Sequence, residues 1–290
     1  MALDTENAAP DSAPAARVKT NHPIGFWFFF WGEFAERCSF YGMKAILPVY
    51  LTAVLGVADT DAGSIMNWFK MGCYALPLLG GFLADRFFGK YWTIVGFSLP
   101  YVLGHFILGI PSSGALAIAL ILLAGGSGVI KPNISTLMGL TYDQKRPGQE
   151  PLRASAFLWF YFAINIGALI STFALPLVTK RYGDDQHAYA IAFQVPAWLM
   201  VAALVVFAAG KPFYGVETRD YHKPTPEERK ERFATLMKLA GVFGLILFFW
   251  IGYEFNDNIW IFFTRDYVDL NVNLSWIHLP NLKGIGLGDY

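Results

Sequence analysis

The sequence predicts an all-α membrane protein, and three observations support this prediction. The chain is 55% hydrophobic and 15% charged, its formal net charge is +0, and its mean hydropathy is +0.40. Apolar runs long enough to cross a hydrocarbon core, which takes about 20 residues, recur along the chain. The connections between them alternate between rich and poor in Lys and Arg. We therefore expect a lipid bilayer as a partner and no nucleic acid.

Seven apolar segments are predicted to be membrane-spanning helices: 24–51, 64–84, 91–110, 115–140, 155–179, 189–209 and 236–264. The predicted organisation is a disordered tail, a six-helix bundle, a charged linker, a seventh helix and a final tail, over 1–22, 23–210, 211–235, 236–264 and 265–290. Within the linker, Thr225 is placed to cap a short surface helix that begins at Pro226. A signal peptide over 24–31 is the alternative for the first apolar run, but no small-residue cleavage site follows it.

The basic residues of the connections predict the orientation. Lys and Arg gather before the first span and in every second connection after it, at Arg17 and Lys19, Arg86 and Lys90, Lys145 to Arg153, and Lys211 to Lys238. Only Lys180 and Arg181 lie on the other side. Because basic loops stay in the cytoplasm, we expect a multi-pass protein of the cell (inner) membrane with a cytoplasmic N-terminus.

The first span carries ionisable side chains that need an explanation. Glu33, Glu36, Arg37, Tyr41 and Lys44 follow one another at helical spacing, so they share one stripe of the helix. A charge at the centre of a bilayer costs about 2.5–3.5 kcal/mol on insertion scales, and such residues mostly face a polar cavity and serve a function. A stripe of carboxylates and cations indicates proton handling.

No enzyme, metal or cofactor signature accompanies this stripe. The two cysteines, Cys38 and Cys73, lie in apolar segments and form no CxxC pair. The five histidines are never at the spacing of metal ligands, and His105 in the third span is interpreted as a packing residue. No nucleophile motif is present, so we expect neither an enzyme nor a bound cofactor.

Residues Gly81 to Lys90, GFLADRFFGK, resemble the loop after the second helix of the major facilitator superfamily. The two glycines allow tight turning, and Asp85, Arg86 and Lys90 can form a cytoplasmic charge latch that breaks when the halves of a transporter rock. The alternative is an ordinary charged loop that fixes the topology.

The first span narrows the resemblance to one family. Glu33-x-x-Glu36-Arg37-x-x-x-Tyr41-Gly is similar to the ExxERFxYYG motif of the proton-dependent oligopeptide transporters, the POT or PTR peptide transporter family. Three later segments resemble its GxGxxKPN, FYxxINxGSL and FWxxxEQ motifs, at 126–133, 160–169 and 249–255. The chain departs from these patterns at Cys38, Phe40, Ala168 and Phe255. Phe40 lacks a hydroxyl, which puts one substrate hydrogen bond in doubt.

The resemblance implies roles for the ionisable residues. Glu33, Glu36, Arg37 and Lys131 would be the proton-coupling group, since protonation of a glutamate would change which cation it pairs with. A static cluster in which Arg37 and the two glutamates neutralise one another is the alternative. Lys44 and Glu254 would form an external gate, with Lys44 where the family commonly has Arg; alternatively, Lys44 reaches the outer interface alone.

A peptide has an ammonium, a carboxylate and variable side chains, so its site needs acidic, basic, amide and aromatic groups. The candidate substrate-binding residues are Tyr41, Lys44, Tyr74, Asn165, Trp250 and Glu254. The resemblance implies a proton-coupled symporter for di- and tripeptides that works by alternating access. The chain would hold the N-terminal six-helix bundle of the major facilitator fold and the first helix of the second bundle, and so be truncated. The alternatives are a non-transporting fragment or assembly partner, and a relative that carries nitrate or an amino acid.

Overall fold

The computed structural model describes residues 21–217 and 225–267, with the backbone alone over 250–266. The described part is helical and contains no strand. Its helices are α1 (Ile24–Val49), α2 (Asp59–Leu83), α3 (Lys90–Leu108), α4 (Ser113–Lys145), α5 (Glu150–Arg181), α6 (Gln186–Ala209) and α7 (Pro226–Tyr267). Single π-helical turns follow α1 and α2, at Tyr50–Val54 and Ala84–Phe88. A helix therefore lies in each of the seven segments predicted as spans.

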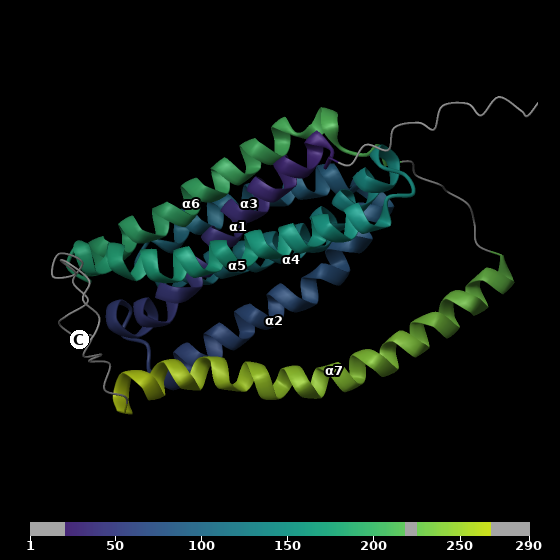
Figure 1. Cartoon of the computed structure of the whole chain (residues 1–290). Helices are drawn as coiled ribbons and strands as arrows, with labels where there is room; N and C mark the ends of the chain where they lie inside the picture. Colours follow the sequence, from purple (N-terminus) through teal and green to yellow (C-terminus); the bar gives the residue numbers. More distant parts are fainter. Residues whose placement is uncertain (1–20, 218–224, 268–290) are drawn as a thin grey trace, which may run out of the picture. The chain divides into compact units, whose positions relative to one another are not determined.

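The chain divides into two units, residues 1–57 with 65–218, and residues 58–64 with 219–290. In the first unit α1 packs against α5 and α6, and α3 packs against α4 and α6 (Figure 1). The α2 helix joins α4 through Asn133, whose Nδ2 donates to the Gly80 carbonyl at 3.2 Å. The α1 helix therefore lies against α5 and α6, with a smaller contact to α4.

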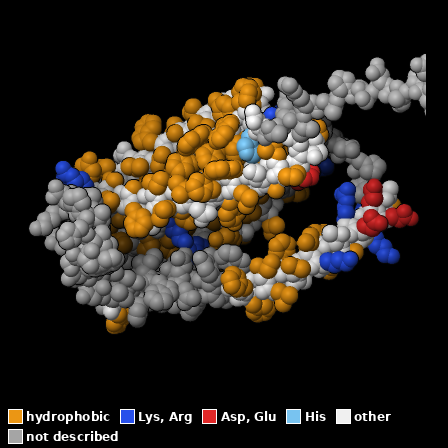
Figure 2. Space-filling model, in the orientation of Figure 1, with side chains coloured by type: hydrophobic (Ala, Val, Ile, Leu, Met, Phe, Trp, Pro, Cys, Tyr) orange, Lys and Arg blue, Asp and Glu red, His pale blue; other side chains and the backbone are white. Residues whose placement is uncertain are grey.

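Five of the described helices are long and apolar enough to cross a membrane, namely α3, α4, α5, α6 and the Pro226–Phe249 part of α7. The α1 and α2 helices are also long enough, but α1 carries Glu33, Glu36, Arg37 and Lys44. Apolar side chains cover the visible face of the first unit (Figure 2), as expected of a surface in contact with lipid. The protein is a multi-pass membrane protein.

The seventh helix differs from its prediction. It begins at Pro226, and not near residue 236, so the predicted surface helix and the predicted span form one continuous helix. Thr225 and Glu228 form a capping box, in which Thr225 N–H donates to Glu228 Oε2 at 2.9 Å and Glu228 N–H donates to Thr225 Oγ1 at 3.2 Å. No Gly or Pro follows until Gly241, so nothing breaks the helix. The predicted tails lie outside the described residues, except for 21–22 and 265–267.

Glycines let α1 and α5 approach closely. A Cβ atom at Gly167 would lie 3.0 Å from the Phe34 carbonyl oxygen and 3.2 Å from Cys38 Sγ, and one at Gly42 would lie 2.8 Å from Leu175 Cδ2. Backbones can approach this far only where small residues meet. The contact fixes the rotation of α1 and turns its charged stripe into the bundle.

Candidate functional site

Glu33, Glu36 and Arg37 form a buried group in α1, named here the acid–arginine cluster. Their exposed fractions are 1%, 2% and 2%. Arg37 Nε lies 3.2 Å from Glu33 Oε1, one helical turn away, and also contacts Glu36 Oε2. The two carboxylates and the guanidinium thus contact one another inside the bundle.

The acid–arginine cluster holds two carboxylates and one guanidinium. With both acids ionised, the cluster carries an excess negative charge in a place shielded from water, which is costly unless another cation or a proton compensates it. In addition, Glu36 Oε1 and Arg37 Nη2 are buried and have no hydrogen-bond partner among the described residues. The arrangement can therefore take up one proton and become neutral.

Lys131 lies on α4 with an exposed side chain. It interacts electrostatically with Arg37, Glu33 and Glu36, but in the described part of the chain it forms no ion pair. Arg37, which belongs to the same helix as the glutamates, is the cation that pairs with both of them. The part of Lys131 in the proton-coupling group stays a prediction.

A small cavity borders the acid–arginine cluster. Its volume is about 20 Å³, and it is lined by Glu33 and Glu36 together with Ser98 and apolar side chains of α3, α4 and α6. A cavity needs about 10–15 Å³ to hold a water molecule. There is room for about one water molecule beside the two carboxylates.

The structure describes four of the six predicted substrate-binding residues with their side chains. Tyr41 and Lys44 on α1 are half-buried, while Tyr74 on α2 and Asn165 on α5 are exposed. Asn165 Nδ2 donates to the Tyr161 carbonyl of its own helix at 2.8 Å. Trp250 and Glu254 lie where only the backbone of α7 is described, so the predicted gate between Lys44 and Glu254 falls outside the described side chains.

Of the three residues of the predicted latch after α2, Lys90 forms the ion pairs that the structure shows. Lys90 Nζ lies 3.0 Å from Asp85 Oδ1 and 2.6 Å from Glu217 Oε1. Arg86 is exposed and forms no ion pair with any residue described here. Gly89 has a φ of 77°, a left-handed conformation that glycine adopts at little cost, and it turns the chain so that Lys90 faces Asp85.

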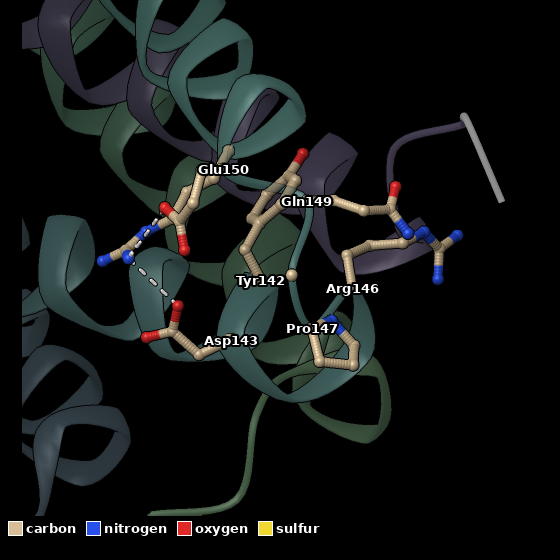
Figure 3. Close-up of a pocket in the computed structure, with 8 residues that line it drawn as sticks. Tyr142, Asp143, Arg146, Pro147, Gln149 and Glu150 are labelled. Atoms are coloured by element: carbon tan, nitrogen blue, oxygen red, sulfur yellow. Dashed lines mark ion pairs between the residues drawn. The ribbon is translucent and has the colours of Figure 1, made fainter. Parts of the chain in front are cut away.

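A larger pocket of about 240 Å³ lies at the α4–α5 connection. Arg153 pairs with Asp143 at 3.0 Å and lies 3.8 Å from Glu150 (Figure 3). Arg146 points away from these acids in Figure 3, and its Nε donates to the Asn21 carbonyl at 2.9 Å. Two arginines and two acids line the pocket, so their formal charges balance and the pocket has no preference for an anion.

Sequence reasoning missed three residues near these sites. Glu217 follows α6 in a linker that the sequence characterises by its basic residues. It is the one acid in 211–217, and the sequence does not indicate its pairing with Lys90. Tyr101 interacts with Glu36 and Arg37, and Ser39 hydrogen-bonds His105 with 3.0 Å between Oγ and Nε2. Neither of these two contacts could be found without knowing which face of α3 meets α1.

Comparisons with known proteins agree with the sequence resemblance. A family model described as the POT family matches residues 91–226. Solute carrier family 15 member 2 of Homo sapiens is 40% identical over 224 residues, which are 72% of this chain and 29% of that protein. Peptide transporter family 1 of Caenorhabditis elegans is 38% identical over 193 residues, which are 63% of this chain and 23% of that protein.

A solved structure also matches. The in meso crystal structure of the POT family transporter PepTSo has a TM-score of 0.65 and 37% sequence identity, over 70% of this chain and 40% of that one. The chain spans less than a third of the curated relatives named above and less than half of this crystallised transporter. With its motifs, its helices and these relatives in agreement, the chain is similar to the POT family over the part that they cover.

Proposed function

We propose that this chain is the proton-binding part of a proton-coupled symporter for di- and tripeptides. The observation that carries the proposal is the acid–arginine cluster, which has two buried carboxylates for one guanidinium in a membrane protein. An ionisable group at such a depth persists where it binds ions or substrate. The names of the relatives support peptides as the substrate class.

The proposed coupling follows from charge. When one glutamate is protonated, Arg37 is fully balanced by the other glutamate, and the cluster is neutral. When that proton leaves, the extra carboxylate attracts the nearby ammonium of Lys131, which has no ion pair among the described residues. Proton binding would thus change the charge that the cavity presents on the α4 side, and two conformations can respond to that change.

The proposed substrate site combines polar and aromatic residues of the six-helix bundle with Trp250 and Glu254 of α7. Lys44, Lys131 and Arg37 would offer cations to the peptide carboxylate. Asn165 and Glu254 would receive its ammonium, while Tyr41, Tyr74 and Trp250 would form the walls. Lys44 with Glu254 would gate one side, and Asp85 with Arg86 would take part in the latch on the other, alongside the observed pair of Asp85 and Lys90.

We place the protein in the cell membrane with its N-terminus in the cytoplasm. Alternate connections carry the basic residues. One of them, Lys211, packs against two aromatic rings. Its ammonium lies 4.3 Å from the ring centre of Trp92 and 4.9 Å from that of Tyr91. Aromatic rings of this kind are enriched at the interface of the membrane with water.

The test is uptake of a labelled dipeptide into proteoliposomes with an inward proton gradient. Two preparations are compared, residues 1–290 alone and the product of the complete reading frame that contains them. Glu36→Gln and Lys131→Ala are expected to abolish gradient-driven uptake, whereas Glu231→Gln, an exposed acid of α7, leaves it unchanged. Unchanged uptake in both site variants would contradict the proposal.

Two other outcomes would favour the alternatives. Uptake by neither preparation would favour a fragment or assembly partner. Uptake of nitrate or an amino acid in place of the dipeptide would favour a relative with another substrate.

A further inference from the structure

We infer that Tyr101 is a positioning residue of the acid–arginine cluster, with a hydroxyl that accepts a hydrogen bond from Arg37 and donates one to Glu36. The inference rests on the function proposed above. It concerns three buried polar atoms, Tyr101 Oη, Glu36 Oε1 and Arg37 Nη2, which make no well-aligned hydrogen bond among the described residues, although the Tyr101 side chain lies within hydrogen-bonding range of Glu36. Their chemistry is complementary, because the guanidinium only donates, the carboxylate only accepts, and a hydroxyl does both.

The position of Tyr101 supports this role. Its side chain is fully buried, with an exposed fraction of 0%, and it interacts electrostatically with Glu36 and Arg37. Leaving a buried hydroxyl without a hydrogen bond is unfavourable, so a hydrogen bond from Tyr101 to the cluster would stabilise the fold. Glu36 Oε1 and Arg37 Nη2 of α1 are buried in the same way. Hydrogen bonds to the Tyr101 hydroxyl would therefore satisfy all three atoms.

The helix next to α3 is shaped to hold the Tyr101 ring. A Cβ atom at Gly126 of α4 would lie 2.7 Å from Tyr101 Cγ and 3.1 Å from the Phe97 carbonyl oxygen. Only glycine leaves room for the ring there. Gly125, the preceding residue, has nothing within 4 Å of such an atom. The first glycine of the GxGxxKPN segment thus serves the placement of Tyr101.

His105 supports the ring from the other side. It lies one turn further along α3, and the two ring centres are 5.0 Å apart. Ser39 Oγ donates its only hydrogen to the Pro196 carbonyl at 2.7 Å, so the 3.0 Å contact with His105 must be donated by Nε2–H. These bonds lock the His105 ring, and with it the space that the Tyr101 ring can occupy.

The groups that face this region come from five helices. They are Glu33, Glu36, Arg37 and Tyr41 of α1, Cys73 of α2, His105 of α3, Lys131 of α4 and Tyr161 of α5. Of these, Glu33 and Glu36 are the carboxyl groups. A hydrogen bond donated by Tyr101 to a carboxylate of the cluster favours the state in which the cluster has lost its proton, because the bond is stronger to a charged oxygen.

The experiment follows carboxyl protonation by infrared difference spectroscopy on the purified chain in detergent, as the pH is lowered. Bands lost in Glu33→Gln and Glu36→Gln identify the cluster. Tyr101→Phe removes one donor and is expected to raise the pH midpoint of the cluster by about one unit, the equivalent of one hydrogen bond to a charged group. Tyr50→Phe is the matched control, since its hydroxyl is also buried and has no hydrogen-bond partner in the part of the chain that the structure describes, and no shift is expected there.

Gly126→Ala gives a second measurement, because it displaces the ring and keeps the hydroxyl. An upward shift in Gly126→Ala but not in Gly125→Ala supports the inference, and it does so even if Tyr101→Phe fails to fold. A midpoint equal to that of the unmodified protein in both Tyr101→Phe and Gly126→Ala overturns it. The readout needs no transport, so an absence of uptake by the unmodified protein contradicts the proposed function and leaves this test intact.

Discussion

The Glu217 carboxylate binds both the side-chain ammonium and the backbone N–H of Lys90. Glu217 Oε1 lies 2.6 Å from Lys90 Nζ, and Glu217 Oε2 accepts the Lys90 backbone N–H at 2.6 Å. Lys90 is the first residue of α3, so its N–H is one that the helix itself cannot satisfy. One carboxylate therefore caps α3 and ties the segment after α6 to it.

We expect Glu217→Ala to lower the stability of the bundle more than Asp85→Ala, although both acids pair with Lys90. The Glu217 side chain is 21% exposed and that of Asp85 is 71% exposed. Hydrogen bonds to charged groups contribute about 1.5–3 kcal/mol, whereas an exposed ion pair contributes about 0–1 kcal/mol. The two losses are measured as changes in the free energy of unfolding in detergent. Equal losses in the two variants would show that capping of α3 by Glu217 adds no stability beyond that of an ion pair.

The start of α1 has a comparable tie to α4 that depends on pH. His22 Nδ1 lies 2.6 Å from Tyr142 Oη, and the His22 ring stacks on Phe26. Burial, and then the positive charge of Arg146, lower the pKa of His22 below its ordinary value of 6.5. The unfolded chain consequently binds more protons than the folded one just below pH 6.5, so stability falls as the pH falls through that window.

Unfolding temperatures at pH 7.5 and pH 5.5 test this tie. The unmodified protein should lose more stability on acidification than His22→Phe, which keeps the stacking and removes the titration. His187→Phe, at an exposed histidine in the first turn of α6, serves as the control and should behave like the unmodified protein. An identical pH response of His22→Phe and the unmodified protein would contradict the assignment.

Local features of the fold were predictable from the sequence, and contacts between distant segments were not. Apolar runs predicted the seven helices, and helical spacing placed Glu33, Glu36 and Arg37 together, because both signals lie within one turn or one segment. The pairing of Lys90 with Glu217 joins positions 127 residues apart. It depends on where the chain leaves α6, which no periodicity encodes. The same is true of Gly126 and Tyr101, whose contact depends on the register of α3 against α4.

Removing the guanidinium of the acid–arginine cluster should be costly in a pH-dependent way. Arg37→Gln leaves two buried carboxylates without their cation, a change that costs about 3–5 kcal/mol in buried ion pairs. Both acids become neutral when protonated, so much of the loss should be regained between pH 8 and pH 5. Arg86→Gln, at an exposed arginine, provides the control. A loss of stability that is independent of pH would mean that Arg37 acts through packing alone.

The same reasoning predicts a rescue. The triple variant Glu33→Gln, Glu36→Gln, Arg37→Gln has no buried charge in the cluster, and neutral replacements of buried ion pairs are often as stable as the originals. It should therefore be more stable at pH 8 than Arg37→Gln, and its stability should change less between pH 8 and pH 5. A triple variant as unstable as the single one would contradict the charge argument.

The capping box at the start of α7 gives a prediction that is independent of the bundle. Thr225→Ala removes the side-chain acceptor of the Glu228 N–H, and the loss of an N-cap costs a helix end about 1 kcal/mol. Hydrogen exchange of the amides of residues 227–230 should accelerate by about fivefold, since 1.4 kcal/mol corresponds to a factor of ten. Thr235→Ala makes the same chemical change at an exposed position inside the helix and, because alanine has the higher helix propensity, should leave these amides unchanged or slower. Equal acceleration in the two variants would show that Thr225 does not fix the start of this helix.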